Sequence, residues 1–175
     1  LHHAVGGGMY ADHAELSLRI FSAAHRTGIA LTHLPVLYQQ GGFDRPPLAE
    51  QRRFVHADVD VFIDLLARLS AVIRPHPRMR LGVAPHSLRA VGPEALARVL
   101  ADARAIDADM PVHMHVSEQI AEVEDCLAHR GARPVAECRR AFPQPWFSAG
   151  RAHLAPLLPV AHSGGIASLH RYDPL

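Results

Sequence analysis

The sequence predicts a single α/β domain, on two observations. Short apolar runs that suit buried strands alternate with longer amphipathic stretches that suit helices, an order typical of a parallel sheet covered by helices. The chain has 175 residues, 49% of them hydrophobic, which is enough for one globular core. This pattern does not decide whether the sheet closes into a barrel.

The first two elements are a helix and a strand. Apolar residues recur at helical spacing over 12–27, and Gly28 follows as a C-terminal stop. The apolar run 29–38 has the length of a buried strand. Paired glycines and paired prolines over 39–47 then predict a loop.

A long amphipathic stretch begins the next unit. The apolar positions of 51–73 fall on one side of a helix, which Pro75 and Pro77 are expected to end. The segment 80–85 is again short and apolar, so a second strand is expected there.

The third unit repeats this order. Proline in a first turn predicts a helix over 93–106, and 110–116 returns to an apolar strand. A further helix is expected from Glu118 or Gln119 until Gly131. Beyond about Pro134 no clear period remains.

Charge and cysteine content narrow the class of function. The formal net charge is +1, so nothing calls for a nucleic acid or an anionic membrane as partner. Cys126 and Cys138 have no CxxC spacing, which suggests neither a disulfide framework nor a thiolate zinc site. No secretion signal or apolar run of membrane-spanning length is visible, and a reducing cytoplasm is the expected location.

The strand 110–116 carries the strongest chemical signal. His113 and His115 lie two positions apart, so their side chains face the same side of a strand, and Glu118 follows just past its carboxyl end. Imidazole is a common zinc ligand, and a metal-bound water needs a nearby base. Histidines satisfied by backbone hydrogen bonds, with Glu118 at a helix N-terminus, are the alternative.

The strand 80–85 leads into a second polar group. His86 and Arg89 follow it directly and should lie at the same rim as His115. Arg89 suits a two-point grip on a substrate carboxylate, and a solvated loop arginine is the alternative. No GxSxG motif is present, and neither cysteine lies in the context of a nucleophile, so metal-activated water is favoured over covalent catalysis.

These residues resemble the formiminoglutamate deiminases of the amidohydrolase superfamily over roughly 1–135. The segments that carry the resemblance are Leu-His-His at 1–3, Tyr-Ala-Asp at 10–12, LPVLY at 34–38, GF at 42–43, QRRF at 51–54, APHSLRAV at 84–91 and HMHVSEQ at 113–119. HxHxxE marks the superfamily, and APHSLRAV together with QRRF narrows the resemblance to this family.

The resemblance implies a fold, a reaction and a set of roles. The fold would be a partial (β/α)8 TIM-like metal-dependent hydrolase barrel, from about strand 2 or 3 to strand 5 or 6. The reaction would hydrolyse the formimino C–N bond of N-formimino-L-glutamate to N-formyl-L-glutamate and ammonia. His115 would bind zinc or another divalent metal, Glu118 would move protons, and His86, Arg89 and Tyr10 would contact the substrate. The complete enzyme is expected to act on this small molecule as a homodimer.

The sequence also departs from the family. The first-strand HxH pair is not found, one of the two sixth-strand histidines is replaced, with His153 as the second, and Asp173 lies in no matching context. We therefore expect a fragment: 1–135 as the central segment of the barrel and 136–175 as a divergent or frameshifted tail that is poorly ordered. A single clear ligand is too few for catalytic zinc, so this chain alone should hold no metal and be inactive. The alternatives are a fragment of another deaminase or chlorohydrolase of the superfamily and a non-catalytic α/β remnant.

Overall fold

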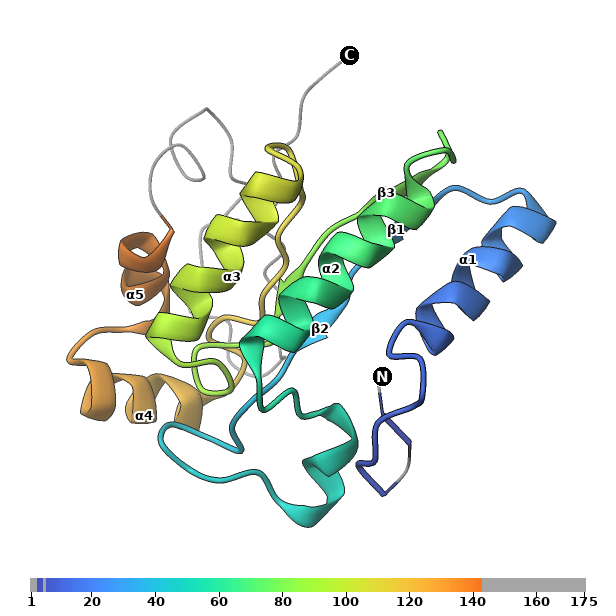
Figure 1. The fold of residues 1–175 in the computed structure, drawn as a ribbon. Helices are drawn as coiled ribbons and strands as arrows, with labels where there is room; N and C mark the ends of the chain where they lie inside the picture. The colour runs from blue at the N-terminus through green and yellow to red at the C-terminus, as the bar shows by residue number, and fades with distance from the viewer. Residues whose placement is uncertain (1–2, 5, 143–175) are drawn as a thin grey trace.

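The protein has an α/β fold, as the sequence predicts. The computed structural model describes residues 3–4 and 6–142. The described elements are α1 (Glu15–Thr27), β1 (Leu31–His33), β2 (Val36–Leu37), η1 (Ala49–Phe54), α2 (Val59–Ile73), β3 (Met79–Leu81), β4 (Ala84–Pro85), α3 (Pro93–Ile106), α4 (Ile120–Arg130) and α5 (Pro134–Ala141). Figure 1 shows α2 and α3 side by side in front of the strands, with α4 and α5 on the side of α3 that faces away from α2.

The strands are parallel, as predicted. Leu31 of β1 lies opposite Met79 of β3, and Val36 of β2 lies opposite Ala84 of β4, in each case 48 positions further along the chain. The pairing of β2 with β4 thus continues the register of β1 with β3. A third segment runs beside the second through parallel bridges from Val83 to Val112 and from Ser87 to His115. Three neighbouring chain segments therefore end at the same edge.

Two of the predicted strands are interrupted. The run 29–38 forms β1 and β2 with a gap at Leu34 and Pro35, and Pro35 has no N–H to donate to a neighbour. In 110–116 only the bridges at Val112 and His115 form. The bridge partners are three positions apart on this segment and four on its neighbour, so the neighbour carries one extra residue, as in a β-bulge.

The predicted helix 51–73 is wrong at its start. Its residues 51–54 belong to the 3-10 helix η1, and α2 begins at Val59. The side chain of Asp58 caps α2 by accepting a hydrogen bond from the Asp60 backbone N–H at 2.8 Å. Between the two helices, the His56 N–H donates to the Tyr38 carbonyl at 2.8 Å. An N-cap within the apolar pattern therefore divides the stretch in two.

Helix ends signalled by glycine or proline are confirmed. Gly28 and Gly131 end α1 and α4 in the left-handed conformation, with φ of 72° and 66°. Pro93 lies in the first turn of α3. The helix α5 lies where the sequence has no clear period, and buries Cys138 against Met114 with a sulfur–sulfur distance of 3.8 Å. The expected tail begins within α5, and its part from 143 on, with His153 and Asp173, lies outside the described residues.

The core lies between the helices and the strand layer. Side chains of α2 and α3 meet the inner side of the strands, and most of these side chains are less than 5% exposed. The main contributors are Phe62, Leu65, Leu66, Leu69, Leu96, Val99, Leu37, Leu81, Val83 and Val112. Burial of apolar side chains is the principal favourable term in folding. The packing of these side chains therefore holds the strands in place, and with them the polar residues at the carboxyl ends of the strands.

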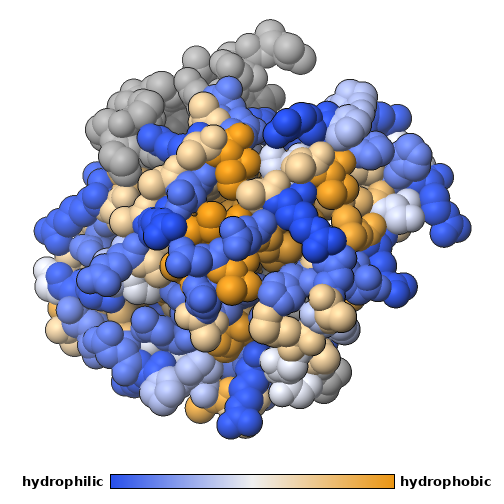
Figure 2. Space-filling view, viewed as in Figure 1, coloured by the Kyte–Doolittle hydropathy of each residue, from blue (hydrophilic) through white to orange (hydrophobic). Residues whose placement is uncertain are grey.

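The surface on the side of α2 and α3 carries both apolar and polar side chains. Figure 2 shows apolar side chains on this face interrupted by hydrophilic ones. Within the described ranges, no helix combines the length and the apolar character needed to cross a membrane.

A buried hydrogen bond joins α1 to the strand layer and gives a first prediction. The Ser17 hydroxyl, in a residue only 2% exposed, lies 2.9 Å from Nε2 of His33. Burial lowers the pKa of His33 to about 4, so the ring is neutral at pH 7. Ser17→Ala should lower the free energy of unfolding by about 1–2 kcal/mol in a urea titration, because His33 loses its partner. Ser22→Ala, on the exposed side of α1, is the control and should leave stability unchanged.

Candidate active site

The carboxyl ends of the three neighbouring segments bring a tyrosine and two histidines together. The ring of Tyr38 lies edge-on to that of His86, with centroids 4.7 Å apart, and His86 lies 5.0 Å from His115. Backbone hydrogen bonds of 2.9 Å fix the spacing, from His86 N–H to the Leu37 carbonyl and from His115 N–H to the His86 carbonyl. The predicted residues His86 and His115 are therefore direct neighbours.

A turn after His115 carries Glu118 back toward this edge. Ser117 has a φ of 57°, in the left-handed region that residues other than glycine seldom occupy. The backbone N–H of Glu118 then donates to Oε2 of Glu122 at 2.8 Å, one turn further along. This turn directs Glu118 toward Arg89 at the end of the neighbouring segment.

Arg89 is held between two carboxylates. Its Nη2 lies 3.0 Å from Oε2 of Glu118, and its Nη1 lies 3.3 Å from Oε2 of Glu122. The Arg89 side chain is 23% exposed, so these contacts bury it in part and it is not fully solvated. Its guanidinium is the positive charge of the site.

The charges of the cluster set the protonation of its members. The hydrogen bond from Arg89 lowers the pKa of Glu118, against the opposing effect of burial, so Glu118 is a carboxylate at neutral pH. Burial, with the nearby His115 and Arg89, lowers the pKa of His86 to about 4, although Glu118 opposes this. Burial also raises the pKa of Tyr38, with Arg89 opposing. Beside the guanidinium of Arg89, Glu118 is thus a carboxylate, His86 a neutral imidazole and Tyr38 a phenol.

His115 is the one predicted metal ligand, and one of its ring nitrogens is available. Its Nδ1 is buried and has no hydrogen-bond partner among residues 3–4 and 6–142. Nδ1 of the neighbouring His86 lies 3.0 Å from the Ser87 hydroxyl. In the described part of the chain no three His, Cys, Asp or Glu side chains are grouped so as to hold a metal ion. Since a catalytic zinc has at least three protein ligands, these residues do not by themselves fit one.

Tyr10 is not part of this cluster in the described structure. It is half-buried in the segment before α1 and makes no hydrogen bond or ring contact with the strand-end residues described above. Its role toward a substrate stays a prediction. Tyr38 and its partner Gln51, whose Nε2 donates to the Tyr38 hydroxyl at 2.9 Å, were not predicted as site residues. The position of Tyr38 at the carboxyl end of a predicted strand was the available signal.

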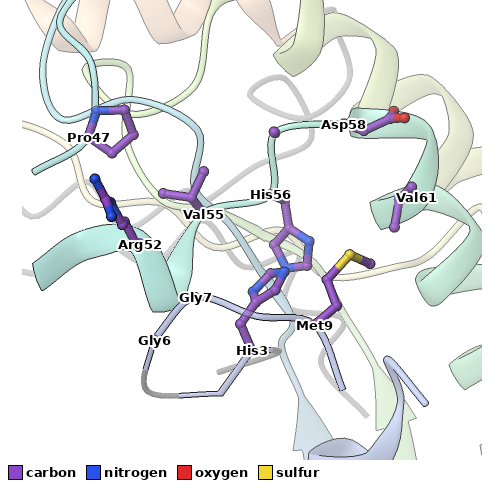
Figure 3. Close-up of a pocket in the computed structure, with 11 residues that line it drawn as sticks. His3, Gly6, Gly7, Met9, Pro47, Arg52, Val55, His56, Asp58 and Val61 are labelled. Atoms are coloured by element: carbon purple, nitrogen blue, oxygen red, sulfur yellow. The ribbon is translucent and has the colours of Figure 1, made fainter. Parts of the chain in front are cut away.

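A pocket of about 430 Å³ lies elsewhere, between the N-terminal segment and the chain from η1 into α2. Figure 3 shows the imidazoles of His3 and His56 next to each other beside Met9; their centroids are 4.9 Å apart. Burial is the main cause that lowers the pKa of His3, and it lowers that of His56 to about 3. None of the predicted site residues lines this pocket.

Comparisons with known proteins give the context for this site. No protein-family model matches the chain. A solved structure of an amidohydrolase from Brucella melitensis is 40% identical, with a TM-score of 0.71 over 81% of this chain and 31% of that one. An adenosine deaminase from Xanthomonas campestris with bound zinc is 26% identical, with a TM-score of 0.54 over 69% of this chain and 24% of that one.

The fold and these structures define the class of protein as that of the amidohydrolases. Within it, the chain is similar to formimidoylglutamate deiminase of Pseudomonas aeruginosa, with 44% identity over 174 residues, which is 97% of this chain. The predicted resemblance is thus confirmed, and the chain is related to enzymes, as expected. It spans 37% of the length of that deiminase and a smaller share of the two solved structures.

Proposed function

We propose that this chain is a segment of a deiminase that hydrolyses the formimino C–N bond of N-formimino-L-glutamate, giving N-formyl-L-glutamate and ammonia. The observation that carries the proposal is the pair of Arg89 and Glu118 beside His86 and His115 at one edge of a parallel sheet. The similarity to formimidoylglutamate deiminase over 97% of the chain supports the choice of substrate. In this proposal the segment supplies about strands 2 or 3 to 5 or 6 of a barrel.

Arg89 has the chemistry to hold a carboxylate of the substrate. A guanidinium offers parallel N–H donors to a carboxylate, and that of Arg89 already binds the oxygens of Glu118 and Glu122. A glutamate carboxylate would take the place of Glu118 on Nη2. The neutral imidazole of His86 would border the same substrate, 5.0 Å from the ring of His115.

Glu118 is the proposed proton carrier. Because Arg89 lowers its pKa, Glu118 is ionised at neutral pH and starts as a proton acceptor. When the substrate carboxylate takes its place on Arg89, Glu118 becomes free to accept a proton from the attacking water. The same group would then donate a proton to the departing nitrogen, which leaves as ammonia.

The described residues do not suffice for a metal centre. His115, with its buried unpaired Nδ1, stays the candidate ligand for zinc or another divalent ion. We propose that the 175-residue chain alone neither retains zinc in stoichiometric amount nor releases ammonia from N-formimino-L-glutamate. Metal analysis of the purified chain and an ammonia assay test this, and stoichiometric zinc with turnover would refute it. Cytoplasmic location and a homodimer of the complete enzyme stay predictions.

Ligand binding tests the choice of substrate. N-formyl-L-glutamate, the proposed product, should perturb the NMR signals of Arg89 and His86 in the full chain. Adenosine is the matched competitor, because an adenosine deaminase is among the similar structures and a purine ring carries no carboxylate. Perturbation by adenosine and not by N-formyl-L-glutamate would favour the second candidate, a ring deaminase or chlorohydrolase of the superfamily. Perturbation by neither would favour a non-catalytic remnant.

A further inference from the structure

The carboxylate of Glu122 lies beneath the two charged residues of the candidate active site. Glu122 belongs to the first turn of α4, and its side chain is 0% exposed. Its Oε2 accepts hydrogen bonds from the Glu118 backbone N–H at 2.8 Å and from Nη1 of Arg89 at 3.3 Å. Its Oε1 is buried and has no hydrogen-bond partner among the described residues. Among the described residues, both hydrogen bonds of the Glu122 carboxylate therefore go to the site.

The two carboxylates that Arg89 binds differ in exposure. The Glu118 side chain, on Nη2, is 33% exposed, whereas the Glu122 side chain, on Nη1, is fully buried. A partly exposed carboxylate exchanges an arginine for water at a lower cost than a buried one, which is strongly unfavourable when left without its partner. Glu122 is thus the fixed partner of Arg89, and Glu118 is the exchangeable one.

The backbone at Ser117 needs support that Glu122 supplies. A residue other than glycine in the left-handed region persists only where its surroundings hold it there. The hydrogen bond from the Glu118 N–H, directly after Ser117, ties this turn to α4. The side chain of Glu118 is therefore oriented by the same buried carboxylate that binds Arg89.

We propose that Glu122 is a positioning residue that anchors Arg89 through Nη1 and fixes the turn that carries Glu118, so that Nη2 exchanges Glu118 for a ligand carboxylate while Arg89 stays in place. The identity of that ligand rests on the proposed function; the anchoring does not. Glu122 acts through Arg89 and Glu118 and does not itself touch the substrate.

The test uses the full chain with Glu122→Gln and Glu122→Ala, and with Glu124→Gln as the control. Glu124 is exposed on the same helix and loses the same charge. Glutamine keeps an acceptor oxygen, so hydrogen exchange of the Glu118 amide should stay within about twofold of wild type, whereas alanine should accelerate it by about tenfold or more. Both Glu122 variants should shift the side-chain nitrogen resonances of Arg89, and Glu124→Gln should not.

Binding of N-formyl-L-glutamate, measured by calorimetry, connects the anchor to the site. Glu122→Gln should weaken it about tenfold, the scale of one hydrogen bond to a charged group, and Glu124→Gln should leave it unchanged. Unchanged Arg89 resonances in Glu122→Gln would overturn the proposal, even if Glu122→Ala fails to fold. A wild-type chain that does not bind N-formyl-L-glutamate would contradict the proposed function, and the exchange and resonance measurements would still decide the role of Glu122.

Discussion

We expect Gly82→Ala to lower the free energy of unfolding by about 3 kcal/mol, because the sheet has no space for a methyl group at this position. A Cβ on Gly82 would collide with Cδ2 of Leu34, and would lie 2.7 Å from the carbonyl oxygen of Pro111 and 3.0 Å from its Cγ. Leu34 and Pro111 belong to the two segments on either side of Gly82. The Gly82 N–H donates to the His33 carbonyl of one segment, and the Val83 N–H donates to the Pro111 carbonyl of the other. The methyl would therefore push the sheet apart in both directions.

The matched control is Gly8→Ala. A Cβ at Gly8 meets no atom within 4 Å, and its φ lies outside the left-handed region. This variant should unfold within about 0.5 kcal/mol of wild type in a urea titration followed by circular dichroism. Equal losses for the two variants would mean that the three segments are not as closely packed as the structure has them.

The sequence predicted the order of the main helices and strands as far as α4, because hydrophobic periodicity directly reflects which faces are buried. It was less successful at boundaries that depend on a single backbone contact. Asp58 begins α2 through its side-chain cap, although the apolar pattern around it continues without a break. Pro35 likewise divides the first strand into β1 and β2 while the register remains the same. Such features interrupt hydrogen bonding without changing the apolar pattern.

The site was predictable as far as strand ends alone determine it. His86 and His115 follow adjacent parallel segments, so the expectation that they meet at one rim followed from topology and is confirmed. The partners of Arg89 were not predictable, because they depend on the left-handed turn at Ser117. Glu122 looked like an ordinary acidic residue in a first helical turn, and only the fold reveals that its side chain is buried against Arg89.

Loss of the Arg89 ion pairs is expected to have a large effect on the stability of the protein. We expect Arg89→Met to lower the free energy of unfolding by about 3 kcal/mol at pH 7, because it leaves the buried carboxylate of Glu122 without a compensating charge. Methionine retains much of the apolar stem, so most of the loss should come from the charge. The control is Arg98→Met: Arg98 also pairs with two carboxylates, but its side chain is 55% exposed. Arg98→Met should leave the free energy of unfolding close to that of wild type, because exposed ion pairs contribute little.

A second substitution separates the buried charge from other effects of losing Arg89. In the double variant Arg89→Met with Glu122→Gln, no buried carboxylate is left uncompensated, so the total loss should be smaller than the sum of the two single losses by about 1–2 kcal/mol. Urea unfolding of the four proteins at pH 7 measures this coupling. Additive losses would show that Arg89 and Glu122 do not depend on each other, and the site would then lack the fixed charge pair on which both Glu118 and a bound carboxylate would rely.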